Sequence, residues 1–260
     1  MKKIYELIGA NTIKEIGKEI CEGCKEEVTL KEIPIIGGAD KGKLQIFRFG
    51  CKCEDLKNAR EAIEARERAK KQHAIDMFEL NSLINAKLKK STFKTYQPKN
   101  DSQEKALVWA VDYCKNFDPE LSPSVLFTGH YGVGKSHLAV SIIKYLNNRG
   151  TTAIFTSVPK LFTKIKSSFK DDKVTEQQML EALEAVDLLV LDDLGAEQGT
   201  QWQTTKFFEI VDARAGKPTI YTTNHSLESL EKHCGTRNFE RLDDLKVIMF
   251  EGKSHRRKEM

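Results

Sequence analysis

The second half of the chain alternates short, continuous apolar runs with longer stretches in which apolar residues recur every three or four positions. Continuous runs of about 4–8 apolar residues are typical of buried strands, and the periodic stretches are typical of helices. This pattern predicts strands over 125–128, 153–156, 187–193 and 219–224, and helices over 101–117, 138–146, 161–169, 176–186 and 207–213. Strands that alternate with helices predict an α/β fold, in which a parallel sheet with right-handed crossovers carries flanking helices.

The first half of the chain follows other patterns. Residues 1–20 predict a short helix, because their apolar residues recur at helical spacing: Ile4, Leu7, Ile8, Ile13, Ile16 and Ile20. Residues 54–72 are densely charged. Opposite charges lie four positions apart in Glu64/Arg68 and Glu67/Lys71, which favours an exposed helix.

These patterns suggest three parts. The more apolar stretch 75–88 has two interpretations: it docks on a partner, or it packs on the next domain. Residues 91–98 have the composition of a linker. We therefore expect a small module over 1–53, a helical linker over 54–97 and an α/β domain over 98–260.

Composition narrows the class of protein. The chain has 260 residues and a formal net charge of only +4, so any contact with nucleic acid has to come from a local patch. No run approaches the ~18 apolar residues of a membrane span, and Glu6 and Gly9 interrupt the apolar centre that a signal peptide needs. We expect a cytoplasmic protein without membrane contact. In that reducing compartment its six cysteines hold metal or stay free rather than form disulfides.

Four of the cysteines form two close pairs. Cys21 and Cys24 precede a hairpin-like spacer, and Cys51 and Cys53 follow it. Two such pairs predict a site with four thiolate ligands for Zn²⁺, and the metal would supply folding energy that so small a module cannot gain from its core. The site would be structural, because no nearby His or Glu is placed to activate water. The alternative is four free thiols in a loop-rich module.

The stretch from Gly129 to Ser136 fits the phosphate-loop pattern G-x-x-x-x-G-K-S/T at every fixed position. Its glycines let successive backbone amides curl around phosphate oxygens, and the following helix adds its unpaired donors. Lys135 is expected to reach the β- and γ-phosphates of ATP, and the Ser136 hydroxyl to bind Mg²⁺. The predicted nucleotide-binding residues are Gly129, His130, Tyr131, Gly132, Val133, Gly134, Lys135, Ser136 and His137.

Polar side chains end two later strands. Asp192 and Asp193 follow a buried apolar run, and Asn224 closes a Thr-Thr-Asn strand. Ligands of parallel sheets sit at the carboxyl ends of the strands, so these residues are expected beside the phosphate loop. Asp192 is predicted to hold Mg²⁺, Asp193 to polarise an attacking water, and Asn224 to hold that water or the γ-phosphate. The alternatives are a surface turn for the two aspartates and a turn cap for Asn224.

Taken together, the stretches 129–136, 188–197 and 222–224 resemble the bacterial and phage replicative helicase loaders of the DnaC/DnaI type, which are AAA+ ATPases. The resemblance covers roughly residues 90–256 and implies the AAA+ fold. It also implies that Arg241 is an arginine finger completing a neighbouring subunit's site, with Arg237 as the other candidate. Arg256 resembles the family's γ-phosphate sensor, although His255 stands where the family has Tyr.

Two further expectations follow from the resemblance. Most AAA+ enzymes carry Glu where this chain has Asp193, which implies slow or partner-stimulated hydrolysis. The family also has an extra helix after the second strand, which here carries Lys160, Phe162, Lys164 and Lys166. These residues are candidates for following a single-stranded DNA backbone and stacking a base. The alternative is an ordinary amphipathic helix whose lysines face water.

The resemblance implies an ATP-dependent loader of the replicative helicase. The expected partners are the hexameric helicase, which the cysteine module would grip, single-stranded DNA, and further copies of the chain that associate through AAA+ domains. The expected cofactors are ATP, Mg²⁺ and Zn²⁺. Two alternatives stay open: a transposition helper ATPase with a similar AAA+ core, and an adaptor that binds ATP without hydrolysing it. A small-molecule kinase fits poorly, because the Thr-Thr-Asn strand and the late arginines would have no role.

Overall fold

The chain forms two compact units. The computed structural model describes residues 13–35, 40–78, 84, 86–168, 175–197, 199–235, 239, 242 and 245–254. Contacts divide the chain into Met1–Arg66 and Glu67–Met260, and helix α2, Lys52–Phe78, contains this division. Within the described parts of the chain, none of the helices combines the length and the apolar character that crossing a bilayer requires.

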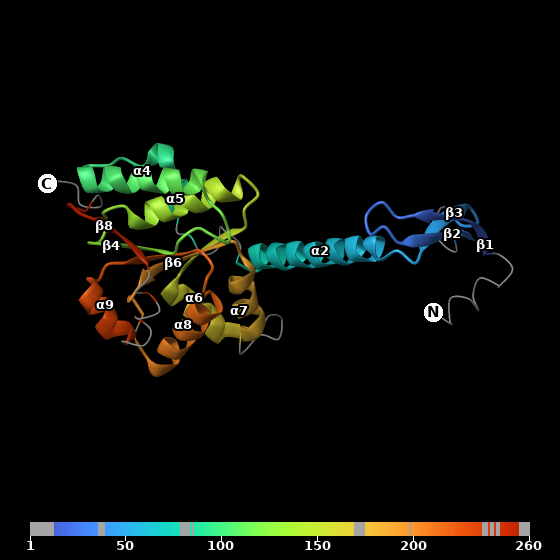
Figure 1. The fold of residues 1–260 in the computed structure, drawn as a ribbon. Coiled ribbons are helices and arrows are strands. Elements are labelled where there is room, and N and C mark those ends of the chain that lie inside the picture. The colour runs from blue at the N-terminus through green and yellow to red at the C-terminus, as the bar shows by residue number, and fades with distance from the viewer. Residues whose placement is uncertain are drawn as a thin grey trace. The chain divides into compact units, whose positions relative to one another are not determined.

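The first unit is built on an antiparallel sheet of three strands in the order β1-β2-β3 (Figure 1). Its strands are β1 (Lys14–Ile20), β2 (Glu27–Pro34) and β3 (Leu44–Phe49). The helix predicted over 1–20 is therefore wrong for 14–20, and 1–12 lie outside the described residues. Ile16 and Ile20 have helical spacing, but Gly17 between them weakens a helix, and β1 pairs with β2 from Lys14 to Ile20.

The second unit contains a five-stranded parallel sheet in the order β5-β6-β7-β4-β8. Its strands are β4 (Val125–Gly129), β5 (Ala153–Ser157), β6 (Leu188–Leu194), β7 (Thr219–Thr223) and β8 (Lys246–Phe250). The predicted α/β fold is confirmed. Strand β8 was not predicted, and it pairs with β4 along its whole length.

Helices cover both faces of this sheet (Figure 1). Helices α4 (Asp101–Lys115) and α5 (Lys135–Asn147) pack on one face, together with the short turns η2 (Leu88–Lys90) and η3 (Phe93–Thr95). The other face carries α6 (Val158–Ser168), α7 (Glu176–Ala185), α8 (Gln201–Ala213) and α9 (Leu227–Cys234). Phe78, at the end of α2, is 1% exposed and belongs to the same apolar cluster as α6, α7, α8 and α9. The apolar end of α2 therefore packs on this face of the parallel sheet.

The strand order determines where the polar residues meet. Strand β7 lies between β6 and β4, although it follows both of them in the chain. The carboxyl ends of β4, β6 and β7 are therefore neighbours. The predicted site residues lie at these ends: the phosphate loop at β4, Asp192 and Asp193 at β6, and Asn224 after β7.

Candidate functional site

The phosphate loop connects the end of β4 to the start of α5. Gly134 is the N-cap of α5 and has φ +107°. Because glycine has no side chain, no side chain of the N-cap residue bonds the amides of the first turn. A Cβ on Gly134 would lie 2.7 Å from the ring of Tyr96, and one on Gly129 would lie 2.1 Å from the carbonyl oxygen of Phe250. Glycine is therefore required at both positions. The uncapped amides of α5 remain available to bind an anion.

Lys135 lies at the centre of the site and is 4% exposed. Its ammonium donates to the carbonyl oxygens of Gly129, at 2.6 Å, and His130, at 2.8 Å, and to the side-chain oxygen of Asn224, at 2.8 Å. A buried ammonium needs such acceptors to offset its loss of hydration. These contacts place its positive charge between the loop and the end of β7.

The two aspartates at the end of β6 have different environments. Asp192 is buried and accepts a hydrogen bond from the Thr222 hydroxyl at 2.6 Å. Burial raises the pKa of Asp192 to about 6, and the neighbouring charge of Asp193 adds to this rise, while hydrogen bonds from Thr222 and Ser136 oppose it. Asp193 has φ +57° and lines the adjacent cavity. Its carboxylate accepts from the side-chain amide of Asn224 at 3.3 Å.

A cavity of about 920 Å³ lies against the phosphate loop. Its lining joins the loop and α5 to the ends of β6 and β7 through Tyr131, Gly132, Gly134, Lys135, Ser136, His137, Asp193, Ala196 and Asn224. Val133 instead points into the core and is fully buried. The remaining wall comes from residues between Ala86 and Lys99, so the stretch read as a linker forms part of the site.

This wall is fixed to α5 by His137. The His137 ring nitrogen Nε2 lies 3.1 Å from the Thr92 carbonyl oxygen and 3.2 Å from the Thr95 hydroxyl. Burial lowers the pKa of His137. Tyr96 packs edge-on against its ring, with the ring centroids 5.3 Å apart. His137 was predicted from its place after the loop, whereas nothing in the local pattern indicated Tyr96.

The hydroxyl of Tyr96 provides a test of fit for a phosphate-bearing ligand. Among the described side chains it is the buried polar atom that has no hydrogen-bond partner, and it lies beside the Cβ position of Gly134. An unpaired buried donor next to uncapped helix amides suits an anionic ligand. Together with Lys135, the donors fit the phosphates of a nucleotide, and the oxygens of Ser136 and Asp192 fit Mg²⁺.

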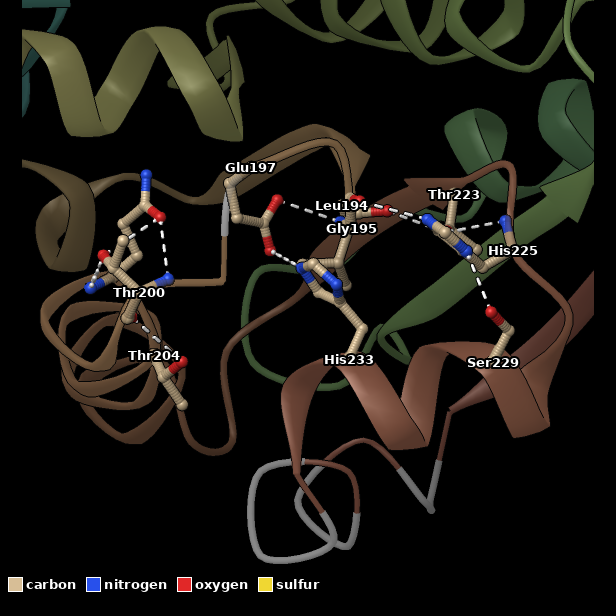
Figure 2. Close-up of polar contacts among 10 residues, drawn as sticks. Leu194, Gly195, Glu197, Thr200, Thr204, Thr223, His225, Ser229 and His233 are labelled. Carbon is tan, nitrogen blue, oxygen red and sulfur yellow. Dashed lines mark hydrogen bonds and ion pairs between the residues drawn. The ribbon is translucent and has the colours of Figure 1, made fainter.

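A second polar cluster lies at the loops that follow β6 and β7 (Figure 2). It joins Glu197, which follows β6, to His225, which follows β7, and to His233 of α9. These residues were not predicted to be functional. Their only sequence signal is position, because Glu197 ends the Leu-Gly-Ala-Glu stretch and His225 follows Asn224 directly.

The four paired cysteines lie together in the first unit. Their sulfur atoms are all within 4.8 Å of one another, with Cys21 and Cys51 at 3.2 Å and Cys24 and Cys51 at 3.6 Å. Four thiolates at about 2.3 Å from one Zn²⁺ lie roughly 3.8 Å apart, so the cluster fits a tetrahedral zinc site. Cys53 contributes from the first turn of α2.

Of the four residues proposed to contact DNA, the structure contradicts one. The interpretation of Phe162 as a base-stacking residue is wrong, because its side chain is 1% exposed and packs in the core against Trp202. The apolar stripe of α6 faces the sheet and takes Phe162 with it. Lys164 lies over the ring of Phe78 at 4.9 Å, and Lys166 lies over the ring of Trp202 at 4.8 Å. Lys160 is exposed.

The three arginines named from the resemblance lie outside the described residues. Arg237 and Arg241 fall in the segment between Gly235 and Leu245, and Arg256 falls after Ser254. Their roles therefore stay predictions.

The family that matches this chain is described as ATP-binding, which agrees with a nucleotide site at the phosphate loop. Residues 56–259 match the family described as IstB-like ATP binding protein. The chain is 32% identical over 153 residues to the replicative helicase loader DnaC of Escherichia coli (strain K12), covering 58% of this chain and 62% of that protein. It is also 29% identical over 192 residues to the uncharacterized protein YdaV of the same strain, covering 72% of this chain and 75% of that protein.

Solved structures support the same assignment of the fold. The crystal structure of the DnaC helicase loader matches with a TM-score of 0.59 and 29% identity, covering 64% of this chain and all of that one. The crystal structure of DnaI matches with a TM-score of 0.56 and 26% identity, covering 66% of this chain and 94% of that one. The family match over residues 56–259 includes all five strands of the parallel sheet. The chain spans 62% of the DnaC relative's length.

Proposed function

Since the chain belongs to the family of IstB-like ATP binding proteins, we propose that it is an ATP-dependent loader that places a replicative DNA helicase on single-stranded DNA. The observation that carries this proposal is the convergence of Lys135, Asp193 and Asn224 on one cavity beside an uncapped helix N-terminus. These are the groups that binding and hydrolysis of ATP require.

Each side chain has a separate task in the proposed reaction. Lys135 supplies positive charge where the phosphates bind, and Asn224 holds the γ-phosphate or the attacking water. Asp193 orients that water and accepts its proton. Ser136 and Asp192 would hold Mg²⁺, which when bound neutralises phosphate charge. The carboxylate of Asp193 is one methylene shorter than the usual Glu, so we expect slow hydrolysis that a partner stimulates.

The first unit is proposed to bind the helicase. Zn²⁺ held by Cys21, Cys24, Cys51 and Cys53 would fasten the β1–β2 turn to the start of α2 and so fix the shape of the module. This site would be structural rather than catalytic, because thiolates occupy all four ligand positions.

Assembly and DNA contact complete the proposal. Arg241, or Arg237, would reach the ATP site of a neighbouring copy, and Arg256 would sense the γ-phosphate within its own chain. Lysines of α6 would contribute electrostatic contact with single-stranded DNA, without stacking by Phe162. The proposed location is the cytoplasm, where replication proteins act on DNA.

The decisive experiment combines the chain with a replicative helicase. We expect ATP-dependent association by size measurement, and ATP turnover that rises when helicase and single-stranded DNA are added. Arg241→Ala should abolish stimulated turnover and helicase loading, whereas Arg149→Ala, an exposed control at the far end of α5, should preserve both. If Arg241→Ala left turnover and loading intact, the shared-site mechanism would be wrong.

Two other functions predict different results. The family description specifies ATP binding without specifying a helicase, so a transposition helper is the second candidate. A pull-down that captures a transposase and no helicase would favour it. An adaptor that only binds ATP would associate with the helicase but show no turnover with either partner added.

A further inference from the structure

The backbone that carries Asp193 is held in an unusual conformation. Asp193 has φ +57°, a region that residues with a Cβ seldom adopt, and Gly195 follows with φ +88°. The amide of Ala196 donates to the carbonyl oxygen of Asp193 at 3.1 Å, which closes a tight turn. Such a conformation persists only where the surroundings fix it. The contacts of this turn therefore determine where the Asp193 carboxylate points.

Glu197 holds the turn from one side (Figure 2). One of its carboxylate oxygens accepts from the amide of Gly195 at 3.0 Å, and the other accepts from Nε2 of His233 at 3.1 Å. The Glu197 side chain is 6% exposed. A carboxylate so deeply buried requires donors that compensate for its lost hydration, and these two contacts provide them.

His225 holds the same turn from the other side. Its Nε2 lies 3.0 Å from the carbonyl oxygen of Gly195, which can only accept, so Nε2 carries a proton. Its Nδ1 lies 3.0 Å from the hydroxyl of Ser229 on α9. A Cβ on Gly195 would lie 2.5 Å from the His225 ring. Gly195 is thus enclosed between Glu197 and His225, with both its amide and its carbonyl bonded.

The same contacts reach the end of β7. His225 follows Asn224, and its carbonyl oxygen accepts from the Thr128 hydroxyl of β4 at 2.9 Å. The hydroxyl of Thr223 donates to the carbonyl oxygen of Leu194 at 2.7 Å. Asn224 and Asp193, which touch each other at 3.3 Å, therefore sit on two backbone segments that one hydrogen-bond network joins.

We propose that Glu197 is a positioning residue for ATP hydrolysis, which holds Asp193 and Asn224 in a fixed relation and ties both to helix α9 through His233. Glu197 does not line the cavity, whereas Asp193, Ala196 and Asn224 do, so it acts through the turn. Helix α9 ends at Cys234, shortly before Arg237 and Arg241 in the chain. The network thus connects the nucleotide site to helix α9. This inference rests on the proposed ATPase function.

The test compares Glu197→Ala with Glu197→Gln in the full-length protein. Gln keeps an oxygen for the Gly195 amide and a polar group for His233, so it should rescue what Ala loses. We expect kcat to fall at least ~10-fold in Glu197→Ala, with KM and the affinity for ADP within about 3-fold of wild type, because small misplacement of catalytic groups acts on the chemical step. Glu197→Gln should stay within about 3-fold of wild type. Glu228→Ala, on the exposed side of α9, is the matched control.

A second readout does not depend on turnover. Misplacement of Asn224 should reduce the preference for ATPγS over ADP in Glu197→Ala, and the amides of 193–197 should exchange hydrogen faster. An unchanged kcat and an unchanged ATPγS preference would overturn the proposal. Equal loss of nucleotide binding and thermal stability in both variants would also overturn it, since that result indicates a role only in folding.

The turnover and affinity measurements separate the proposed ATPase function from the positioning role of Glu197. If the wild-type protein with helicase and single-stranded DNA does not hydrolyse ATP, the proposed ATPase function fails. The positioning role is then decided by the ratio of ATPγS to ADP affinity alone. A lower ratio in Glu197→Ala, restored in Glu197→Gln, supports coupling between Glu197 and Asn224, and an unaltered ratio refutes it.

Discussion

The ammonium nitrogen of Lys135 lies 2.8 Å from the side-chain oxygen of Asn224, although 89 residues separate them in the chain. The amide nitrogen of the same Asn224 side chain lies 3.3 Å from the carboxylate of Asp193. One neutral side chain therefore bridges the group proposed to bind phosphate and the group proposed to orient water. This bridge places the ends of β4, β6 and β7 in a single site.

Replacement of Asn224 by alanine should reduce ATP hydrolysis by roughly 10²-fold, because it removes a preorganised hydrogen-bonding group from the reacting centre. ADP affinity should change little, since Lys135 and the loop amides remain. Single-turnover hydrolysis and ADP titration measure the two effects. The exposed Asn116, which bonds only within its own helix end, provides the control variant Asn116→Ala. An Asn224→Ala variant with full turnover would remove Asn224 from the mechanism.

The stability of the protein should depend on the titration of Asp192. Burial raises the pKa of Asp192 to about 6, and the charge of Asp193 adds to the rise. Between the ordinary aspartate value of about 4 and about 6, the folded protein binds this proton more tightly than the unfolded chain does. The contribution of Asp192 therefore stabilises the fold as pH falls through this window, and this stabilisation is lost as pH rises through it.

Asp192→Asn removes this dependence while keeping an oxygen that can accept from Thr222. In EDTA, its free energy of unfolding at pH 8 should exceed that of the wild type by up to about 3 kcal/mol, and the difference should disappear near pH 4. Urea denaturation at both pH values measures it. The exposed Asp112→Asn should show no such trend. An equal difference at pH 4 and pH 8 would show that Asp192 is not the titrating group.

Removal of one clustered cysteine should abolish zinc binding. The Cys51 sulfur lies 3.2 Å from that of Cys21 and 3.6 Å from that of Cys24, so Cys51→Ser removes a central ligand. We expect one Zn²⁺ per wild-type chain by elemental analysis and less than half of that in Cys51→Ser after dialysis. The buried Cys114 lies outside the cluster, and Cys114→Ala should retain the metal. Equal zinc content in all three proteins would rule out the four-cysteine site.

Arg214 should be essential for stability rather than for catalysis. Its buried guanidinium donates to the carbonyl oxygens of Leu183, Glu184, Val186 and Pro218. Arg214→Met leaves these acceptors without a partner and should cost roughly 3–5 kcal/mol of unfolding free energy by urea denaturation. Arg149→Ala, whose side chain stacks on Tyr145 at the surface, should cost less than about 1 kcal/mol. A loss below 1 kcal/mol in Arg214→Met would contradict this role.

Local sequence patterns predicted some elements correctly and misled on others. The stretches that became β4, β5, β6 and β7 contain short apolar runs, which predict strands buried on both faces, and the structure buries them in this way. The stretch that became β1 has isoleucines four positions apart, which imitates a helix, and only pairing with β2 makes it a strand. The stretch that became β8 is partly exposed, and it is a strand because β4 offers an open edge.

The sequence by itself indicated the groups proposed to bind and react: the phosphate loop, the two aspartates after an apolar run, the asparagine after a strand and the two cysteine pairs. Each lies within a few residues of the pattern that identifies it, so its chemistry is encoded locally. Tertiary structure alone decided that Asn224 touches Lys135, that residues 86–99 wall the cavity, that Phe162 is buried and that Glu197 meets His233. These contacts depend on strand order and on which face of a helix meets the sheet. Both depend on how distant segments of the α/β unit pack against one another, which local periodicity does not specify.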